Sequence, residues 1–268
     1  MKTSVFKLIC SVFAVSLLMS SCLGDSDNSV KVERELALIK IENYTTKCAV
    51  TANGYITNAS IQDLREDRCY YIAYKITSSG ASGNVYNAEY INVIDPDPVP
   101  QTYLMENNLV LDGDAISSLG VGRFSMGDYF GDKWQFFAKI PLKEGEGVNA
   151  QFYYDSNNQK SETGDDLEKN QVIIDVRFTK TNVNSNNVTA PERDIEVIGD
   201  FSELRRTIYK DKAEYTDADG YKYANVAIKF RYTKIKANTT TGETEIGYLG
   251  TLSTSGTNTY VMQFYEEK

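Results

Sequence analysis

The sequence predicts an all-β protein of two domains. Its 19 tyrosines and 11 phenylalanines, with many Thr, Val and Ile residues, favour strands. Short runs of alternating apolar and polar residues recur along the chain, separated by breaks that carry Gly, Asn or Ser. Three of the five prolines stand at alternate positions in Asp95–Pro100. Proline cannot donate to a sheet ladder and stiffens the chain, so this segment marks the domain boundary.

The N-terminus predicts export and a lipid anchor. Lys2 and Lys7 precede an uncharged apolar run, Leu8–Met19. Positive charge followed by an apolar run too short to span a membrane is typical of a secretory signal. The run ends in Ser20-Ser21-Cys22 and resembles a bacterial lipoprotein signal. We therefore expect residues 1–21 to be removed, Cys22 to be acylated and residues 22–33 to form a polar tether. Several acyl chains at one residue hold a domain on a membrane.

The first domain, residues 34–98, contains four strand-like runs. In the third run the aromatic and branched residues Tyr70, Ile72, Tyr74 and Ile76 share one face, as expected of a strand with one buried side. A loop rich in Ser and Gly follows, which indicates a hairpin. The four runs are Leu36–Ile41, Cys48–Val50, Cys69–Ile76 and Val85–Ile94.

The second domain, residues 99–268, continues the same pattern, and half-buried strands at short intervals are typical of a sandwich or barrel. One helix has a start signal, because Asp200-Phe201-Ser202-Glu203 provides a capping residue with an acid three residues later. The expected strands are Leu109–Leu111, Trp134–Ile140, Ala150–Tyr154, Val172–Thr179, Asp194–Ile198, Tyr223–Ile235, Glu245–Leu252 and Thr259–Tyr265.

Composition excludes several functional classes. Loss of residues 1–21 removes Lys2 and Lys7 and no acid, so the net charge falls from −9 to −11. An acidic surface repels polyanions and disfavours nucleic acid as a partner. The chain has no histidine, which removes Ser-His-Asp and Cys-His arrangements and the commonest metal ligand. It also lacks a phosphate-binding Gly loop, a nucleophile elbow and a dinucleotide fingerprint, so we expect no enzyme and no cofactor.

Two cysteines, Cys48 and Cys69, remain in the exported domain after Cys10 leaves with the signal. A disulfide across the loop of roughly 20 residues between them would stabilise the fold by about 3 kcal/mol. The alternative is two buried free thiols, since free Cys packs like a small apolar residue. Two cysteines without histidine make a poor zinc site, and we predict no metal site.

Three sequence features suggest ligand binding, each with a simpler structural interpretation. Tyr129, Phe130 and Trp134 could stack on sugar rings, or they could lead into a core strand. Asp217–Gly220 begins like a calcium loop but lacks the distal Glu, so a hairpin turn fits better. The acidic stretch Ser161–Glu168 is typical of a solvated surface.

The order of features resembles the NigD-like lipoproteins of Bacteroidetes. The resemblance is carried by the lipoprotein signal, the acid-bearing tether, the strands Tyr71–Ile76 and Tyr86–Ile91, and Asp200–Leu204. It implies an OB-like β-barrel followed by a β-sandwich, and a link to bacteriocin immunity. It also implies release to the outer membrane, because Leu23 follows Cys22, and Asp25 and Asp27 are similar to acidic surface-export signals.

The sequence thus predicts a non-catalytic outer-membrane lipoprotein, displayed at the cell surface or facing the periplasm, that binds an unknown protein or glycan. One alternative is a fimbrillin-like pilus or adhesin subunit, cleaved after Arg34 or Arg68 and assembled by strand exchange, for which the last strand could be donated. A third is a carboxylate-dependent glycan hydrolase, because 37 acidic residues allow many pairings.

Overall fold

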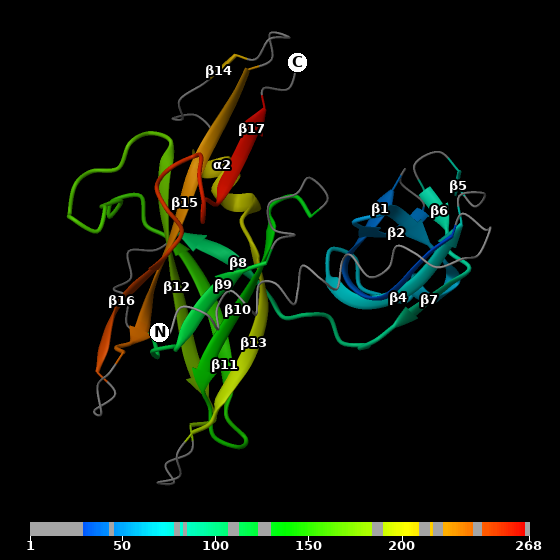
Figure 1. Ribbon diagram of the computed structural model, residues 1–268, viewed down its shortest axis with the longest axis horizontal. Coiled ribbons are helices and arrows are strands. Elements are labelled where there is room, and N and C mark those ends of the chain that lie inside the picture. Colours follow the sequence, from blue (N-terminus) through cyan, green and yellow to red (C-terminus); the bar gives the residue numbers. More distant parts are fainter. Residues whose placement is uncertain are drawn as a thin grey trace. The chain divides into compact units, whose positions relative to one another are not determined.

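The computed structural model describes residues 29–42, 46–77, 81–82, 85–106, 113–122, 130–183, 190–208, 215–216, 222–237 and 243–265. The predicted signal peptide, Cys22, Tyr129 and the turn 217–220 lie outside these ranges. The chain divides into two compact units, unit 1 ending at Val99 and unit 2 beginning at Pro100 (Figure 1). The division falls one residue beyond the predicted boundary, inside the proline-rich segment.

Unit 1 is a curled seven-stranded sheet whose strands follow the order β5-β6-β3-β2-β1-β4-β7. A short 3-10 helix, Ala59–Ile61, lies between β3 and β4. The strands are β1 (Ser29–Glu42), β2 (Thr46–Thr51), β3 (Gly54–Thr57), β4 (Cys69–Thr77), β5 (Ala81–Ser82), β6 (Val85–Asn87) and β7 (Tyr90–Val93).

The segment from β6 to β7 closes this sheet into a barrel. β6 pairs with β3 in parallel and β7 pairs with β4 in antiparallel orientation. Between them, Ala88 N donates to Thr57 O at 3.0 Å and Glu89 N donates to Lys75 O at 2.8 Å. β1, β2, β3, the β6–β7 segment and β4 therefore surround one core, and the predicted OB-like barrel is confirmed. The predicted face is also confirmed, since Tyr70, Ile72, Tyr74 and Ile76 all lie in that core.

β1 begins earlier than the sequence indicated. Ser29–Val32 pair with Tyr74–Thr77 of β4, so the last residues of the predicted tether, 22–33, belong to the sheet. The alternation of Val30 and Val32 with charged residues is the sequence pattern that could have predicted this earlier start of the strand. A bulge shifts the register between Val32 and Glu35 and turns the Glu35 side chain toward the barrel interior.

The described residues of unit 2 form a ten-stranded sheet and one helix, α2 (Ser202–Ile208). Its strands are β8 (Gln101–Glu106), β9 (Ser118–Val121), β10 (Lys133–Pro141), β11 (Gly147–Tyr154), β12 (Gln171–Thr181), β13 (Glu192–Asp200), β14 (Tyr215–Thr216), β15 (Lys222–Ile235), β16 (Thr244–Leu249) and β17 (Val261–Tyr265). The predicted strand Leu109–Leu111 falls outside the described residues. β8 and β9 were not predicted.

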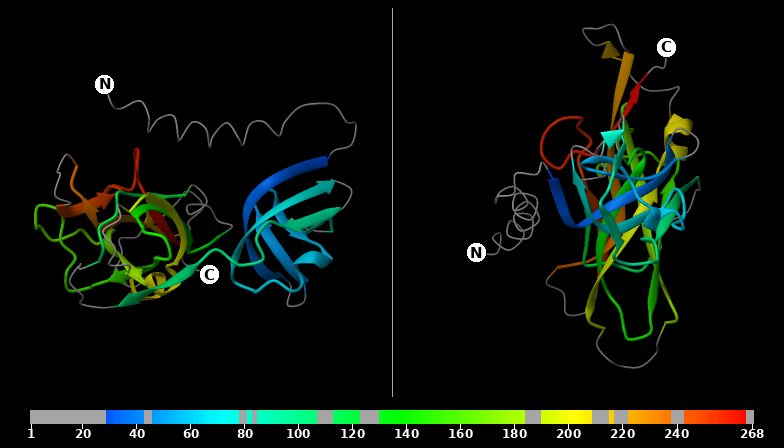
Figure 2. Two further views of the ribbon diagram at one scale, coloured as in Figure 1. Left: turned by 90° about the horizontal axis from the view of Figure 1, so that it is seen from below. Right: turned by 90° about the vertical axis from the view of Figure 1, so that its right-hand side faces the viewer.

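The sheet of unit 2 folds into two layers at β8. Residues Gln101–Tyr103 of β8 pair with β13, whereas Leu104–Glu106 pair with β11. β9, β10 and β13 thus form one layer, and β11, β12 and β15 form the other, with β16 and β17 along the outer edge of β15. Each unit curls around its own interior (Figure 2). The prediction of a β-sandwich for the second domain is confirmed.

One large apolar core fills the space between these layers. It contains Phe136 from β10, Phe152 from β11 and Phe230 from β15, all fully buried. Leu204 and Ile208 of α2, four residues apart on one helical face, close this core. Within the described ranges, no helix has the length and apolar character needed to cross a bilayer.

Candidate functional site

Of the two interpretations of the aromatic stretch, the core interpretation is correct and ligand stacking is wrong for the two residues that the structure describes. Phe130 and Trp134 are each only 2% exposed. The Trp134 ring packs edge-on against Phe201 and Phe230, with ring centroids 5.5 and 5.8 Å apart. Because β10 alternates, Trp134 faces the sandwich core and is unable to stack on an external sugar. Tyr129 lies outside the described residues.

Of the two interpretations of Cys48 and Cys69, the disulfide is wrong, because both cysteines are free and buried. Cys48 lies on β2 opposite Lys40 of β1, whereas Cys69 lies on β4 opposite Leu38. With β1 between them, β2 and β4 are about 9.5 Å apart, and the offset of two residues between Lys40 and Leu38 adds about 6.7 Å along the strands, so the two Cα atoms lie about 11–12 Å apart. A disulfide requires less than about 7 Å. The alternative of two buried thiols is therefore correct.

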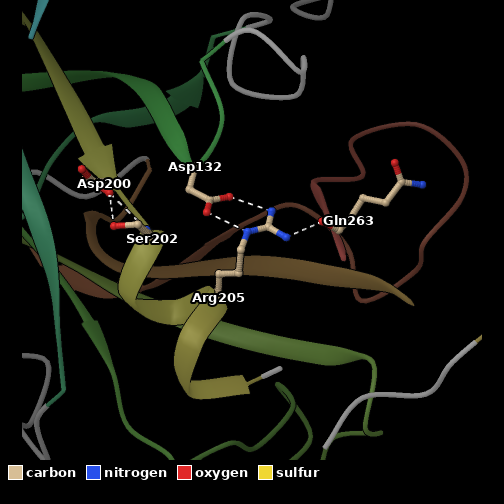
Figure 3. Close-up of polar contacts among 5 residues, drawn as sticks. All are labelled: Asp132, Asp200, Ser202, Arg205 and Gln263. Carbon is tan, nitrogen blue, oxygen red and sulfur yellow. Dashed lines mark hydrogen bonds and ion pairs between the residues drawn. The ribbon is translucent and has the colours of Figure 1, made fainter. Parts of the chain in front are cut away.

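A polar cluster at the start of α2 is the best-defined candidate site in unit 2 (Figure 3). Arg205 reaches from α2 to Asp132, which directly precedes β10. Its Nε and one terminal nitrogen each donate to an Asp132 carboxylate oxygen at 2.7 Å. The other terminal nitrogen donates to the backbone oxygen of Gln263 on β17 at 2.6 Å, and the guanidinium lies over the Phe264 ring. Such a bidentate contact is the strongest form of a hydrogen-bonded ion pair between Arg and a carboxylate.

Asp200 forms the second half of the cluster. Its Oδ1 accepts from the Ser202 hydroxyl at 2.7 Å and from Ser202 N at 3.1 Å, which caps α2 as the sequence indicated. Its Oδ2 accepts from Lys133 Nζ at 2.7 Å and from Gln101 Nε2 at 3.3 Å. Burial alone would raise the pKa of Asp200, but hydrogen bonds from Lys133 and Ser202 outweigh it and lower that pKa.

The cluster joins four strands to one helix. Lys133 and Asp200 are cross-strand partners on β10 and β13, and both are buried. The remaining groups come from β8, α2 and β17, which lie far apart in the chain. Of these roles, sequence reasoning found only that of Asp200, as the capping residue of α2. The roles of Asp132 and Arg205 had no local signal, since 73 residues separate them.

Unit 1 has its own buried polar group. Glu35, at the bulge of β1, accepts from the Tyr74 hydroxyl and from Ala52 N, both at 2.6 Å. Asn53 Nδ2 in turn donates to the Tyr74 oxygen at 2.7 Å. Burial raises the pKa of Glu35, although both hydrogen bonds oppose that shift. The carboxylate thus ties the β2–β3 turn to β1 and β4 at the place where β1 and β2 separate.

A third group lies on the outer face of the β12–β15 layer. Arg231 donates two hydrogen bonds to the carboxylate of Asp175, at 2.5 and 2.9 Å. The hydrogen bonds to Asp175 raise the pKa of Arg231. Lys229, on the same face, pairs with Glu162 and lies over the Tyr248 ring. Glu162 belongs to the predicted acidic loop Ser161–Glu168, which therefore packs against the sheet in part.

The chemistry of these clusters is that of fixed ion pairs. Asp132, Asp175 and Asp200 each accept hydrogen bonds from a cationic side chain in defined geometry. The lowered pKa of Asp200 keeps that carboxylate ionised near neutral pH, which makes it a poor proton donor. Among the described residues, no group of three or more His, Cys, Asp and Glu side chains is placed to hold a metal ion.

No protein-family model and no curated protein matches the chain significantly. Solved structures to which the chain is similar include a NigD-like immunity protein from Bacteroides caccae, 13% identical, covering 84% of this chain and 94% of that one with a TM-score of 0.42. A protein of unknown function from Bacteroides vulgatus is 12% identical and covers 81% of this chain and 89% of that one, with a TM-score of 0.47.

A third structure, described as a candidate lipoprotein from Bacteroides fragilis, is 13% identical and covers 81% of this chain and 97% of that one, with a TM-score of 0.46. A NigD-like protein is therefore among the structures to which this chain is similar. The likeness concerns the polypeptide fold alone.

Proposed function

We propose that this chain is an outer-membrane lipoprotein, anchored through Cys22, whose two β units form a binding or protective module without catalytic activity. The apolar run that ends at Ser20-Ser21-Cys22 supports the anchor. The acidic tether supports display at the cell surface. The negative net charge supports a protein or glycan partner rather than nucleic acid.

One observation carries the non-catalytic part of the proposal. The five buried carboxylates of the described residues, Glu35, Glu146, Asp155, Asp175 and Asp200, each accept at least one hydrogen bond from a donor in their own unit. Such groups hold turns, strands and α2 in place. A glycan hydrolase would instead need two carboxyl groups facing a shared substrate position. A screen of polysaccharides for turnover tests this point, and reproducible hydrolysis would overturn it.

The anchor is tested by metabolic labelling with a fatty-acid analogue in the native host. We expect the wild-type chain to incorporate label and Cys22→Ser to incorporate none. Cys10→Ser is the matched control, because Cys10 lies in the part of the signal that is removed. Equal labelling of Cys22→Ser and the wild type would refute the anchor. A mature N-terminus beyond Arg34 or Arg68 would instead favour the pilus alternative.

Display is tested by adding proteinase to intact cells, with a periplasmic protein as control. Rapid digestion is expected for a surface protein, and protection until the outer membrane is broken would place the units in the periplasm.

The protective role is tested by deleting the gene and exposing cells to bacteriocins from neighbouring strains. We expect the deletion strain to be more sensitive to bacteriocins and the wild-type gene to reverse this. Unchanged sensitivity would refute the protective role and leave only the proposed binding of a partner.

A further inference from the structure

Among the described residues, the first half of β1 pairs with a neighbouring strand on one side only. Ser29–Val32 pair with β4, while β2 contacts β1 only from Leu38 to Glu42 on the opposite side. In the part of the chain that the structure describes, no strand pairs with the β2-facing side of β1 before Leu38. We refer to Val30–Arg34 on this side as the free edge. Unpaired backbone N–H and C=O groups on such an edge are a template for another strand.

The free edge is open to solvent. Val30 is 39% exposed, and the side chains of Lys31 and Glu33 are 58% and 77% exposed. Lys31 Nζ and Glu33 Oε1 are 2.7 Å apart, so the two side chains lie on the same face of the strand. β1 is the dark blue arrow of unit 1 in Figure 2.

The charges of the free edge complement a second copy of the same edge. When two such strands pair antiparallel about Val32, Lys31 lies opposite Glu33 of the other copy, and Glu33 lies opposite its Lys31. Opposite charges directly across a ladder stabilise it and like charges destabilise it. Parallel pairing in register would place Lys31 opposite Lys31. The pattern therefore favours the antiparallel arrangement.

We propose that two copies of this chain associate through the free edge of β1, in a two-fold symmetric antiparallel ladder centred on Val32. The bulge between Val32 and Glu35 bends the strand away and limits the ladder to a few residues. A ladder this short makes a weak dimer that responds to protein concentration.

The position of the edge in the chain suits this contact. Only residues 23–28 lie between Cys22 and β1. A two-fold axis normal to a membrane pairs strands antiparallel and leaves both N-termini on the same side. Confinement to one leaflet would raise the effective concentration of the edges. This last step rests on the proposed acyl anchor, whereas the strand contact does not.

Sedimentation of the mature chain, residues 22–268 with Cys22→Ser to exclude association through lipid, tests the contact. We expect a reversible monomer–dimer equilibrium. Lys31→Glu or Glu33→Lys should each weaken it by about tenfold, because two symmetric attractive pairs become repulsive. The double variant exchanges the charges and should return to within about threefold of the unaltered chain. Lys40→Glu is the control, because Lys40 lies where β2 already pairs with β1.

Cysteine crosslinking tests the register in the same Cys22→Ser background. A mixture of Lys31→Cys and Glu33→Cys chains should form a disulfide-linked pair under mild oxidation, since directly opposite residues are within disulfide reach. Each variant alone should crosslink far less. A monomer at every concentration, or a dimer indifferent to both charge reversals, would overturn the proposal. Failure of acylation at Cys22 would refute the anchor and leave these results unchanged.

Discussion

The Tyr74 hydroxyl donates a 2.6 Å hydrogen bond to Glu35 inside the barrel of unit 1, joining β4 to the bulge of β1. Tyr74 is fully buried, and Glu35 is 9% exposed. The same carboxylate satisfies the N–H of Ala52, where the ladder between β1 and β2 has ended. A charged acceptor thus replaces a missing backbone carbonyl, and a strand pair separates without leaving that donor unpaired.

Tyr74→Phe removes this donor and should destabilise unit 1 by about 1–3 kcal/mol, because Glu35 loses a hydrogen bond in a buried position. Hydrogen exchange of peptides from β1 and β4, followed by mass spectrometry, measures the effect locally. Tyr103→Phe is the control, since Tyr103 is 51% exposed and lies in unit 2. Unchanged protection of β1 in Tyr74→Phe would show that the bond contributes little.

Asp200 should make the stability of unit 2 depend on acid. Its folded pKa lies below the ordinary value of about 3.9, so its contribution is present above that pH and is lost as the pH falls toward the folded pKa. Asp200→Asn leaves Lys133 buried without its anion and should cost about 3–5 kcal/mol at neutral pH. Trp134, the only tryptophan, reports unfolding of unit 2 by fluorescence. The difference in free energy of unfolding between the wild type and Asp200→Asn should narrow below about pH 3.9. A difference that stays constant with pH would contradict a lowered pKa at Asp200.

Glu35 should make the stability of unit 1 depend on pH in the opposite direction from Asp200. Because burial raises its folded pKa, ionising it opposes folding, and stability should fall as the pH rises from about 4.3 through the raised value. Glu35→Gln should remove this part of the pH dependence. Protection of β1 amides, corrected for the intrinsic exchange rate at each pH, measures it. The same slope in both proteins would assign the pH dependence to another group.

Arg205→Lys tests the clamp that holds α2. Lysine keeps the charge but loses the two-pronged contact with Asp132, so unit 2 should lose about 1–3 kcal/mol in urea unfolding followed by Trp134 fluorescence. Arg206→Lys is a matched control one residue away, because the Arg206 side chain is 74% exposed and pairs only at the surface with Glu203. The control should change stability by less than about 0.5 kcal/mol. Equal losses in both variants would contradict the clamp.

The thiols of Cys48 and Cys69 should both react with an alkylating reagent after denaturation, with no reductant present. In the folded protein they should react slowly, because both are buried and burial raises the pKa of the Cys48 thiol. Mass spectrometry counts the labels. A denatured chain that takes up label only after reduction would contain the disulfide that the sheet order forbids.

Some features followed directly from local sequence. The alternation of Tyr70, Ile72 and Tyr74 predicted a strand and its buried face, because side chains on a strand alternate whatever it pairs with. Asp200 predicted the start of α2, because capping acts within a few residues. The predicted export signal that ends at Cys22 also rests on a local pattern, of charge and apolar length, and stays a prediction.

Tertiary structure decided what depends on distant neighbours. The sequence allowed Trp134 and Phe130 to belong to a ligand loop or to a core, and the packing of distant strands around them buries both residues. Cys48 and Cys69 both lie on strands, and the position of β1 between those strands keeps them apart. Asp132 meets Arg205 across 73 residues. Alternation and capping arise from a single stretch of backbone, whereas sheet order and ion pairing depend on which stretches meet, and no local pattern records that.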